Sequence, residues 1–288
     1  MNRPKKPVAI RKVWAKNLFE ELSLINCIAL RYPFAAMDTE FPGTIFHPAV
    51  EKHHLSHLPP DYNYRVMKAN VDALNLIQLG LTLSDAHGNL PDFGTSHSYI
   101  WEFNFSNFDI ESDLQNPDSI ALLERQGIDF HKNRTLGIHS RQFAWLFLNS
   151  RLAFDFNHGS PLTWITFHSA YDFGFLLKIL TGGKLLPENL GTFMIWVNMY
   201  IGGAVYDMKH MIRYCSGLYG GLERVAKTLD VDRMAGRSHQ AGSDSLLTMQ
   251  TFIKLKELYF NREGGEEEIG KFRSVLHGLE VEGTLLLV

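Results

Sequence analysis

Cysteine is scarce in this chain of 288 residues, which contains only Cys27 and Cys215. Neither cysteine belongs to a cluster with the spacing of metal ligands, which argues against a disulfide framework and against a cysteine-based zinc site. This usage fits a reducing compartment. Hydrophobic residues make up 45% of the chain and charged residues 20%, as in ordinary globular proteins. A chain of this length buries enough surface to fold without covalent staples.

Long apolar runs are also missing. The most membrane-like stretch, residues 193–206, is interrupted by Asn198 and by the glycine pair Gly202 and Gly203. It is shorter than the ~20 apolar residues that a membrane span needs. The first residues are polar and basic and lack the apolar segment of a secretory signal. We therefore expect a soluble, intracellular protein that has no membrane partner.

Net charge is low as well, at -3. A protein that coats duplex nucleic acid is normally basic, so this class is disfavoured. A nuclease that admits a few nucleotides can be near neutral, because bound metal ions supply local positive charge. The basic start of the chain, with Arg3, Lys5 and Lys6, is expected to be a flexible tail over residues 1–10.

The periodicity of apolar residues predicts one α/β domain over residues 11–262. A helix is expected over residues 11–31, followed by a buried strand from Phe34 to Glu40. Strand-like runs at 74–83 and 98–105 complete an antiparallel meander. Further strands are expected at 163–168 and 204–207, and helices near 64–73, 117–127, 139–150, 171–180, 188–198, 208–214, 220–229 and 244–262. Strands gathered early and then separated by helices indicate a mixed sheet. Residues 263–288 are expected to form a loosely ordered tail.

Two acidic residues end the first predicted strand. Residues i and i+2 of a strand point to the same face, so Asp38 and Glu40 leave one side of the sheet together. Their neighbours are apolar, and two like charges at the edge of a core are costly unless a cation or a proton compensates them. A second Asp-x-Glu pair, Asp109 and Glu111, lies in a polar setting and is interpreted as surface. The first pair is therefore a candidate metal site.

A histidine and an aspartate five residues apart open the last long helix. His239 lies in a glycine-containing polar loop, where a mobile side chain could reach a water and act as a base. Asp244 follows in the first helical turn, with Ser243 as the expected N-cap. The helix dipole alone would also favour an acid there. The same spacing recurs at His87 and Asp92, in a predicted hairpin turn, and is interpreted as structural.

A third acid remains open between two positions. Asp172 follows the strand at 163–168 and opens a helix, whereas Asp207 ends the short strand at 204–207. Spacing alone does not decide between them. With either acid, carboxylates from three segments and one histidine are the components of a two-metal phosphodiesterase, in which two cations clamp the attacking and leaving oxygens.

Three blocks of the chain resemble a known family. They are Met37 to Gly43, Phe167 to Phe173 and His239 to Leu247, supported by Asn70-Val71-Asp72, Ile77 to Thr82 and Gly220-Gly221-Leu222. In this order they resemble the CCR-associated-factor (Caf/Pop type) deadenylases, over roughly residues 11–262. These enzymes are nuclease subunits of the CCR–NOT complex and belong to the histidine subtype of the DEDD exonuclease superfamily. The loop over 43–60 resembles plant members.

The resemblance implies a fold, an activity and a set of site residues. The fold would be RNase H-like, a mixed sheet flanked by helices. The activity would be 3′-to-5′ removal of poly(A) tails with release of 5′-AMP. Asp38, Glu40, Asp172 and Asp244 would hold two divalent ions, Mg²⁺ or Mn²⁺, and His239 would be the base. The resemblance thus favours Asp172 over Asp207.

It also implies partners and a location. The substrate would be the single-stranded poly(A) tail of messenger RNA, and the protein partners a NOT scaffold subunit and a CCR-type deadenylase subunit. The protein would act in the cytoplasm, including mRNA-processing bodies, and in the nucleus. Two alternatives stay open: a module that mainly docks on the NOT scaffold, and a DEDD exonuclease that trims DNA or transfer-RNA ends. Phe41, His168 and Phe173 are candidates for base stacking, with core packing as the competing interpretation.

Overall fold

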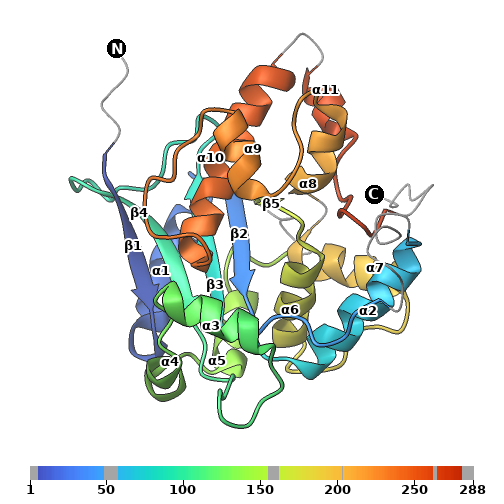
Figure 1. Cartoon of the computed structure of the whole chain (residues 1–288). Helices are drawn as coiled ribbons and strands as arrows, with labels where there is room; N and C mark the ends of the chain where they lie inside the picture. The colour runs from blue at the N-terminus through green and yellow to red at the C-terminus, as the bar shows by residue number, and fades with distance from the viewer. Residues whose placement is uncertain (1–5, 49–57, 155–161, 203, 262–264, 281–288) are drawn as a thin grey trace.

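A six-stranded mixed sheet forms the centre of the molecule (Figure 1). The structure, a computed structural model, describes residues 6–48, 58–154, 162–202, 204–261 and 265–280. The strands are β1 (Val8–Val13), β2 (Phe34–Glu40), β3 (Gln78–Ser84), β4 (Ser98–Asn104), β5 (Thr163–Thr166) and β6 (Val205–Asp207). Their order across the sheet is β1-β4-β3-β2-β5-β6. The predicted meander is confirmed, because β3 pairs antiparallel with both β2 and β4, and the remaining pairs are parallel.

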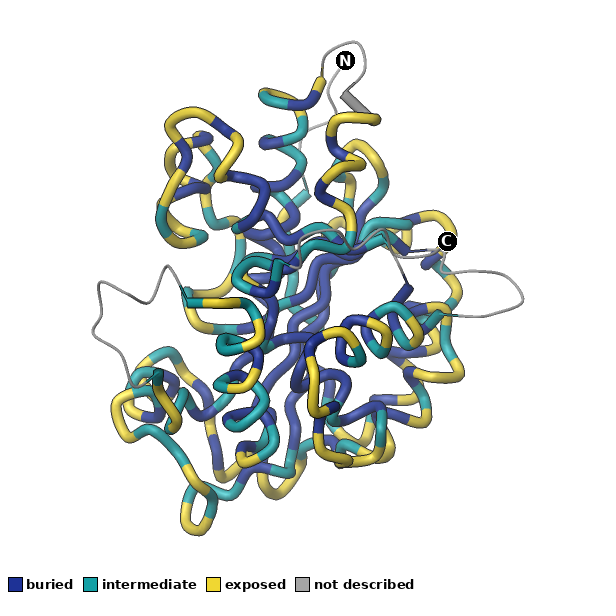
Figure 2. The backbone as a smooth tube through the Cα atoms, turned by 90° about the vertical axis from the view of Figure 1, so that its right-hand side faces the viewer, coloured by how far each residue is buried: buried dark blue, intermediate teal, exposed yellow. Residues whose placement is uncertain are grey.

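Helices cover both faces of this sheet, so that the strands form the buried centre seen in Figure 2. They are α1 (Leu18–Ile28), α2 (Pro60–Ala73), α3 (Pro117–Arg125), α4 (Phe130–Leu136), α5 (Ser140–Leu148), α6 (Ala170–Leu180), α7 (Leu190–Ile201), α8 (Met208–Met211), α9 (Leu222–Thr228), α10 (Ala241–Tyr259) and α11 (Gly265–Gly270). One core joins α1, α2, α5, α6 and α7 to one face of the sheet, and a second core joins α8, α9 and α10 to the other. The predicted α/β class with a mixed sheet is confirmed. Within the described residues, no helix is both long and apolar enough to cross a membrane.

Strand β2 serves both cores because its side chains alternate. Ala35 and Met37 pack into the core of α1, α5 and α6, whereas Ala36 packs into the core of α10. Residues two apart in a strand share a face, so Asp38 and Glu40 point to the same side as Ala36. The alternation therefore places both acids on the face that α10 covers.

Helix α10 lies unusually close to the sheet at Gly80. This residue pairs with Asp38 across β2 and β3. A Cβ atom at Gly80 would lie 1.8 Å from the carbonyl oxygen of Ala241, so only glycine allows the approach. One turn further along, the hydroxyls of Thr82 and Ser245 share a hydrogen bond of 2.9 Å. These contacts fix the first turn of α10 directly above the acidic end of β2.

The amino-terminal part differs from the prediction. The helix expected over 11–31 begins only at Leu18, and Val8–Val13 is instead the edge strand β1. This strand pairs in parallel with β4, from Val8 opposite Ser98 to Val13 opposite Phe103. The pairing partner is about 90 residues away, so local periodicity carries no signal of it. The flexible tail expected over 1–10 is therefore wrong for the residues within β1, and residues 1–5 lie outside the described part.

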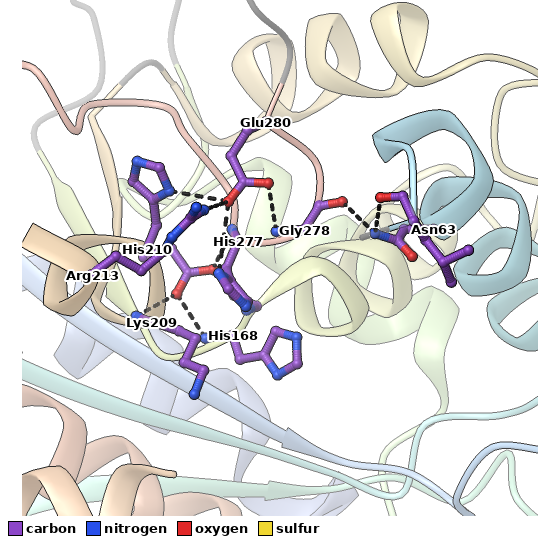
Figure 3. A network of polar contacts seen from close by, with 11 residues as sticks. Asn63, His168, Lys209, His210, Arg213, His277, Gly278 and Glu280 are labelled. Atoms are coloured by element: carbon purple, nitrogen blue, oxygen red, sulfur yellow. Dashed lines mark hydrogen bonds and ion pairs between the residues drawn. The ribbon is translucent and has the colours of Figure 1, made fainter. Parts of the chain in front are cut away.

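The carboxy-terminal part also differs from the prediction. Over 265–280 the expected loose tail is wrong, because α11 and a following segment pack against the domain, with Phe272, Leu276 and Leu279 buried. We call residues 271–280 the C-terminal strap, part of which appears in Figure 3. The amide of Ser274 donates to the carbonyl of Val205 at 2.8 Å, which extends the sheet beyond β6. The apolar end of the chain, residues 284–288, lies outside the described residues.

Candidate metal centre

Four acidic residues meet at the carboxyl end of β2, a central strand of the sheet. Asp38 and Glu40 come from the end of β2, Asp172 from the first turn of α6 and Asp244 from the first turn of α10. Asp172 and Asp244 are buried, at 7% and 8% exposure, and Glu40 is 9% exposed. The Thr39 hydroxyl joins Asp172 to β2, ligand atoms of Glu40 and Asp244 lie within 4.8 Å of one another, and the first turn of α10 lies against Gly80, the pairing partner of Asp38. The structure thus brings together the four carboxylates that the sequence had suggested as ligands.

Burial raises the pKa values of these four acids, and repulsion between neighbouring carboxylates raises those of Asp38 and Glu40 further. Burial, followed by repulsion from Asp172 and Asp244, raises the pKa of Asp38 well above its usual range. Burial and then the same two neighbours raise the pKa of Glu40 in the same direction. Such shifts mean that the ionised cluster is under-compensated by the protein alone. A site of this kind gains free energy when a cation binds or when a proton is taken up.

Asp172 is oriented by the strand beside it. Its Oδ1 accepts a hydrogen bond of 2.6 Å from the hydroxyl of Thr39, which lies between the two acids of β2. Burial raises the pKa of Asp172 to about 7, although the Thr39 hydrogen bond acts in the opposite direction. One carboxylate oxygen is therefore anchored to β2 while the other is free of this bond.

His239 and Asp244 are tied to one another across the start of α10. The amide of His239 donates to Oδ2 of Asp244 at 2.8 Å, and His239 has a left-handed backbone with φ of 59°. Potential ligand atoms of Glu40, His239 and Asp244 all lie within 4.8 Å of one another. The helix begins at Ala241, so the expected N-cap at Ser243 is wrong. The main chain of His239 is held by Asp244, so the imidazole is the part of this residue that can move toward a water at the site.

Arg233 completes the site, and sequence reasoning missed it. Its guanidinium donates to Oδ1 of Asp244 at 2.5 Å and also contacts Glu223 and the Ser243 hydroxyl. The Arg233 side chain is 16% exposed. A lone arginine in a polar loop gives no pattern from which this role could be predicted. Its positive charge lowers the pKa of Asp244 against the raising effect of burial.

The residues fit hard divalent cations. Four carboxylates supply oxygen ligands, which Mg²⁺ and Mn²⁺ prefer, and one guanidinium cannot neutralise four negative charges. The ligands come from a strand and two helix ends, elements that hold side chains more precisely than loops do. The donor set and its unbalanced charge are therefore those of a site for two divalent ions.

The other candidate residues of the sequence make contacts outside the acidic cluster or are exposed at the surface. Asp207 is fully buried and accepts hydrogen bonds from main-chain amides, including those of His168 and Ser169. Asp109 and Glu111 form a surface turn, in which the Glu111 amide donates to Asp109. His87 is exposed in the turn between β3 and β4. These four residues thus have structural explanations that require no metal.

The fold and the acidic cluster together define a metal-dependent phosphodiesterase with an RNase H-like fold. Residues 13–143 match the CAF1 family ribonuclease domain. The chain is 47% identical to the probable CCR4-associated factor 1 homolog 7 of Arabidopsis thaliana, covering 96% of this chain and 94% of the relative. It is 38% identical to the poly(A) ribonuclease pop2 of Schizosaccharomyces pombe, covering 96% and 77%. The chain belongs to the CAF1 family of ribonucleases.

Solved structures agree with this assignment. The Mg²⁺- and Mn²⁺-bound form of S. pombe Pop2p superposes with a TM-score of 0.81 at 38% identity, covering 94% of this chain and 99% of that one. A chain from the structure of the yeast NOT1 MIF4G domain co-crystallized with CAF1 has a TM-score of 0.75 at 34% identity, covering 96% and 100%. The similarity therefore extends over nearly the whole fold.

The acidic cluster should make the stability of the metal-free protein depend on pH. The pKa of Asp172 is about 7 in the fold against an ordinary 3.8, so the folded state binds the extra proton between these values. The free energy of unfolding therefore falls as pH rises through this window, by roughly 4 kcal/mol at most for this group. We expect chelator-treated protein to melt at a lower temperature at pH ~8 than at pH ~5. Asp172→Asn should reduce this dependence, to which Asp38 and Glu40 also contribute. An unchanged slope would contradict a raised pKa of Asp172.

The variant His239→Ala tests whether His239 acts as a general base or as a metal ligand. If His239 accepts a proton from the attacking water, its loss lowers kcat roughly 100-fold. Calorimetric titration with Mn²⁺ should then give nearly unchanged affinity. His87→Ala, an exposed histidine with the same spacing to an aspartate, is the matched control and should behave as wild type. Loss of Mn²⁺ affinity in His239→Ala would make this residue a ligand instead.

Proposed function

We propose that this protein is a 3′-to-5′ exoribonuclease that shortens the poly(A) tails of messenger RNA and releases 5′-AMP. Convergence of Asp38, Glu40, Asp172 and Asp244 at the carboxyl end of β2 carries the proposal. Membership of the CAF1 ribonuclease family and the poly(A) ribonuclease activity named for a relative 38% identical support it. The metal-bound relative supports Mg²⁺ or Mn²⁺ as the ions that these residues hold.

The chain's own groups have distinct tasks in this reaction. Asp38, Glu40, Asp172 and Asp244 hold the ions, which when bound acidify a water and stabilise charge on the phosphate oxygens. The imidazole of His239 takes the proton from that water, because its ring lies beside Glu40 and Asp244. Arg233 holds one oxygen of Asp244 and the His239 amide holds the other, so the carboxylate keeps its direction during turnover.

Adenine selectivity requires an accessible ring near the acids. Phe173 is fully buried, so its candidacy as a stacking residue is wrong. Phe41 lies against Tyr171 and Phe175 at centroid distances of 5.3 and 4.8 Å, which identifies it as a packing residue. His168 is exposed and remains the candidate of the three. We propose that its imidazole contacts a base of the bound tail.

Digestion of a 5′-labelled RNA that ends in oligo(A) tests the activity. We expect a ladder of products shortened by single nucleotides from the 3′ end, which a chelator abolishes. Asp38→Ala should lose at least 100-fold of this activity while its circular dichroism spectrum stays native. Mixed-sequence RNA and DNA of equal length are the controls. A folded and fully active Asp38→Ala would refute the site, and equal rates on all substrates would refute poly(A) specificity.

We further propose that the chain docks on a NOT scaffold and works beside a CCR-type deadenylase subunit, in the cytoplasm, including mRNA-processing bodies, and in the nucleus. Co-crystallization of the NOT1 MIF4G domain with a CAF1 chain 34% identical supports the first partner. Helices α1 and α5 contact one another and pack into the same core. They expose Phe19 at 67% and Trp145 at 64% on the face opposite α10. Exposed aromatic side chains of this kind anchor protein interfaces.

Two double variants test this docking surface. Phe19→Ala with Trp145→Ala should weaken binding to a NOT1 MIF4G domain at least 10-fold, because aromatic anchors carry most of an interface's energy. Hydrolysis of oligo(A) should be unchanged, since α1 and α5 lie on the far face of the sheet. The control is Ile195→Ala with Met199→Ala, a second exposed apolar pair on α7. Loss of binding only in the control pair would place the surface on α7 instead.

A further inference from the structure

Asp207 is a buried carboxylate that the proposed reaction does not use. It ends β6, is fully buried, and accepts hydrogen bonds from main-chain amides of three separate segments. The amides of His168 and Lys209 donate to Oδ1 at 2.7 and 3.0 Å. Those of Ser169 and His277 donate to Oδ2 at 3.1 and 3.0 Å. Four amide donors replace the water that an ionised carboxylate loses on burial, so this group joins segments rather than binding a metal.

One of these segments leads directly into the metal site. His168 has a left-handed backbone with φ of 64°, which is uncommon for a residue with a side chain. The amides of His168 and Ser169 both reach Asp207, and α6 begins at the next residue, Ala170. Asp172 lies two residues further on, in the first turn. Its Oδ1 accepts a hydrogen bond from Thr39, and the turn that leads into its helix is tied to Asp207.

The C-terminal strap completes this arrangement. His277, which donates to Asp207, lies between two further attachments of the strap. On one side, the Ser274 amide donates to β6 at Val205. On the other, Glu280 accepts hydrogen bonds from Arg213 at 2.9 Å and from His210 at 3.2 Å. The strap is therefore held at both ends, and its main chain supplies the fourth donor to Asp207.

We propose that Asp207, with the C-terminal strap that completes its hydrogen bonds, is a positioning residue for the metal ligand Asp172. The inference rests on the proposed metal-dependent function and adds to it a strap that lies about 100 residues from Asp172 in the sequence. Asp207 keeps the strained turn at His168 and Ser169 closed, and this fixes the start of α6. Release of the strap then loosens the turn and moves Asp172 away from the other three acids.

Asp207→Asn in the full chain is the direct test. An amide side chain of the same shape offers one acceptor oxygen where the carboxylate offers two, so two of the four amides lose their partner. Hydrogen–deuterium exchange should show faster exchange at the His168 and Ser169 amides. Mn²⁺ affinity by calorimetry should fall roughly 10-fold, and kcat on oligo(A) should fall with KM little changed. Native exchange at both amides with wild-type Mn²⁺ affinity would overturn the proposal, and complete loss of Mn²⁺ binding would do so too, by making Asp207 a ligand.

Glu280→Gln tests the strap even if Asp207→Asn does not fold, because the Glu280 side chain is partly exposed and is not one of the four site acids. Losing the charge should release the strap, seen as faster exchange at the His277 amide, and should weaken Mn²⁺ binding about twofold to threefold. Unchanged exchange at His168 and Ser169 after such release would overturn the proposal. Lys271→Ala is the control, because Lys271 is an exposed residue of the same strap. It should retain native Mn²⁺ affinity, and a loss as large as that of Asp207→Asn would overturn the role of Asp207.

These measurements separate the two hypotheses. Asp172→Ala should abolish Mn²⁺ binding and hydrolysis, and wild-type protein should show both. If the wild-type chain neither binds Mn²⁺ nor cuts RNA, the proposed function fails. If it does both while Asp207→Asn and Glu280→Gln leave the turn and the Mn²⁺ affinity unchanged, only the positioning role fails.

Discussion

Repulsion among four carboxylates is the constraint on which the rest of this structure depends. Burial raises the pKa of all four acids, and repulsion from Asp172 and Asp244 raises those of Asp38 and Glu40 further. Like charges in a low-dielectric environment repel one another, and their side chains move apart unless the backbone that carries them is fixed. The fold has to supply that rigidity before any cation arrives, and the contacts around the site can be understood as serving this purpose.

Each acid is held by a different device. Strand alternation directs Asp38 and Glu40 to one face, and pairing with β3 prevents β2 from rotating. Helix α10 is seated by the glycine at position 80, where a side chain would meet the helix backbone. Asp172 depends on Thr39 and on the turn closed by Asp207. A shift in any one of these elements would change the distances among the four charges, so we expect residues remote in sequence to have coupled effects on this site.

The sequence allowed prediction of what depends on local pattern. The strand ending in Asp38 and Glu40 and the meander through β4 followed from alternation. Asp172 and Asp244 were predicted from the blocks of sequence that resemble a known family, and the structure places them at the starts of α6 and α10. Edge strand β1, Arg233 and the C-terminal strap were not predictable, because each gains its structure from partners far away in the chain. Secondary-structure propensity depends on neighbours in the sequence, whereas the pairing of an edge strand and the contacts of a single arginine depend on neighbours in space. The start of α10 was misplaced by three residues for a related reason, since the first turn is fixed by contact with Gly80 rather than by a side-chain cap.

Arg233 shows how the fold balances stability against function. Its guanidinium offsets part of the negative charge at Asp244, yet leaves Asp38 and Glu40 with raised pKa values. A second arginine or a lysine would stabilise the metal-free fold further, but it would also compete with divalent cations for the same carboxylates. The incomplete compensation is therefore required by the chemistry. The charge that destabilises the empty site is the same charge that gives bound cations their affinity, so the scaffold must be stable enough to carry it without help.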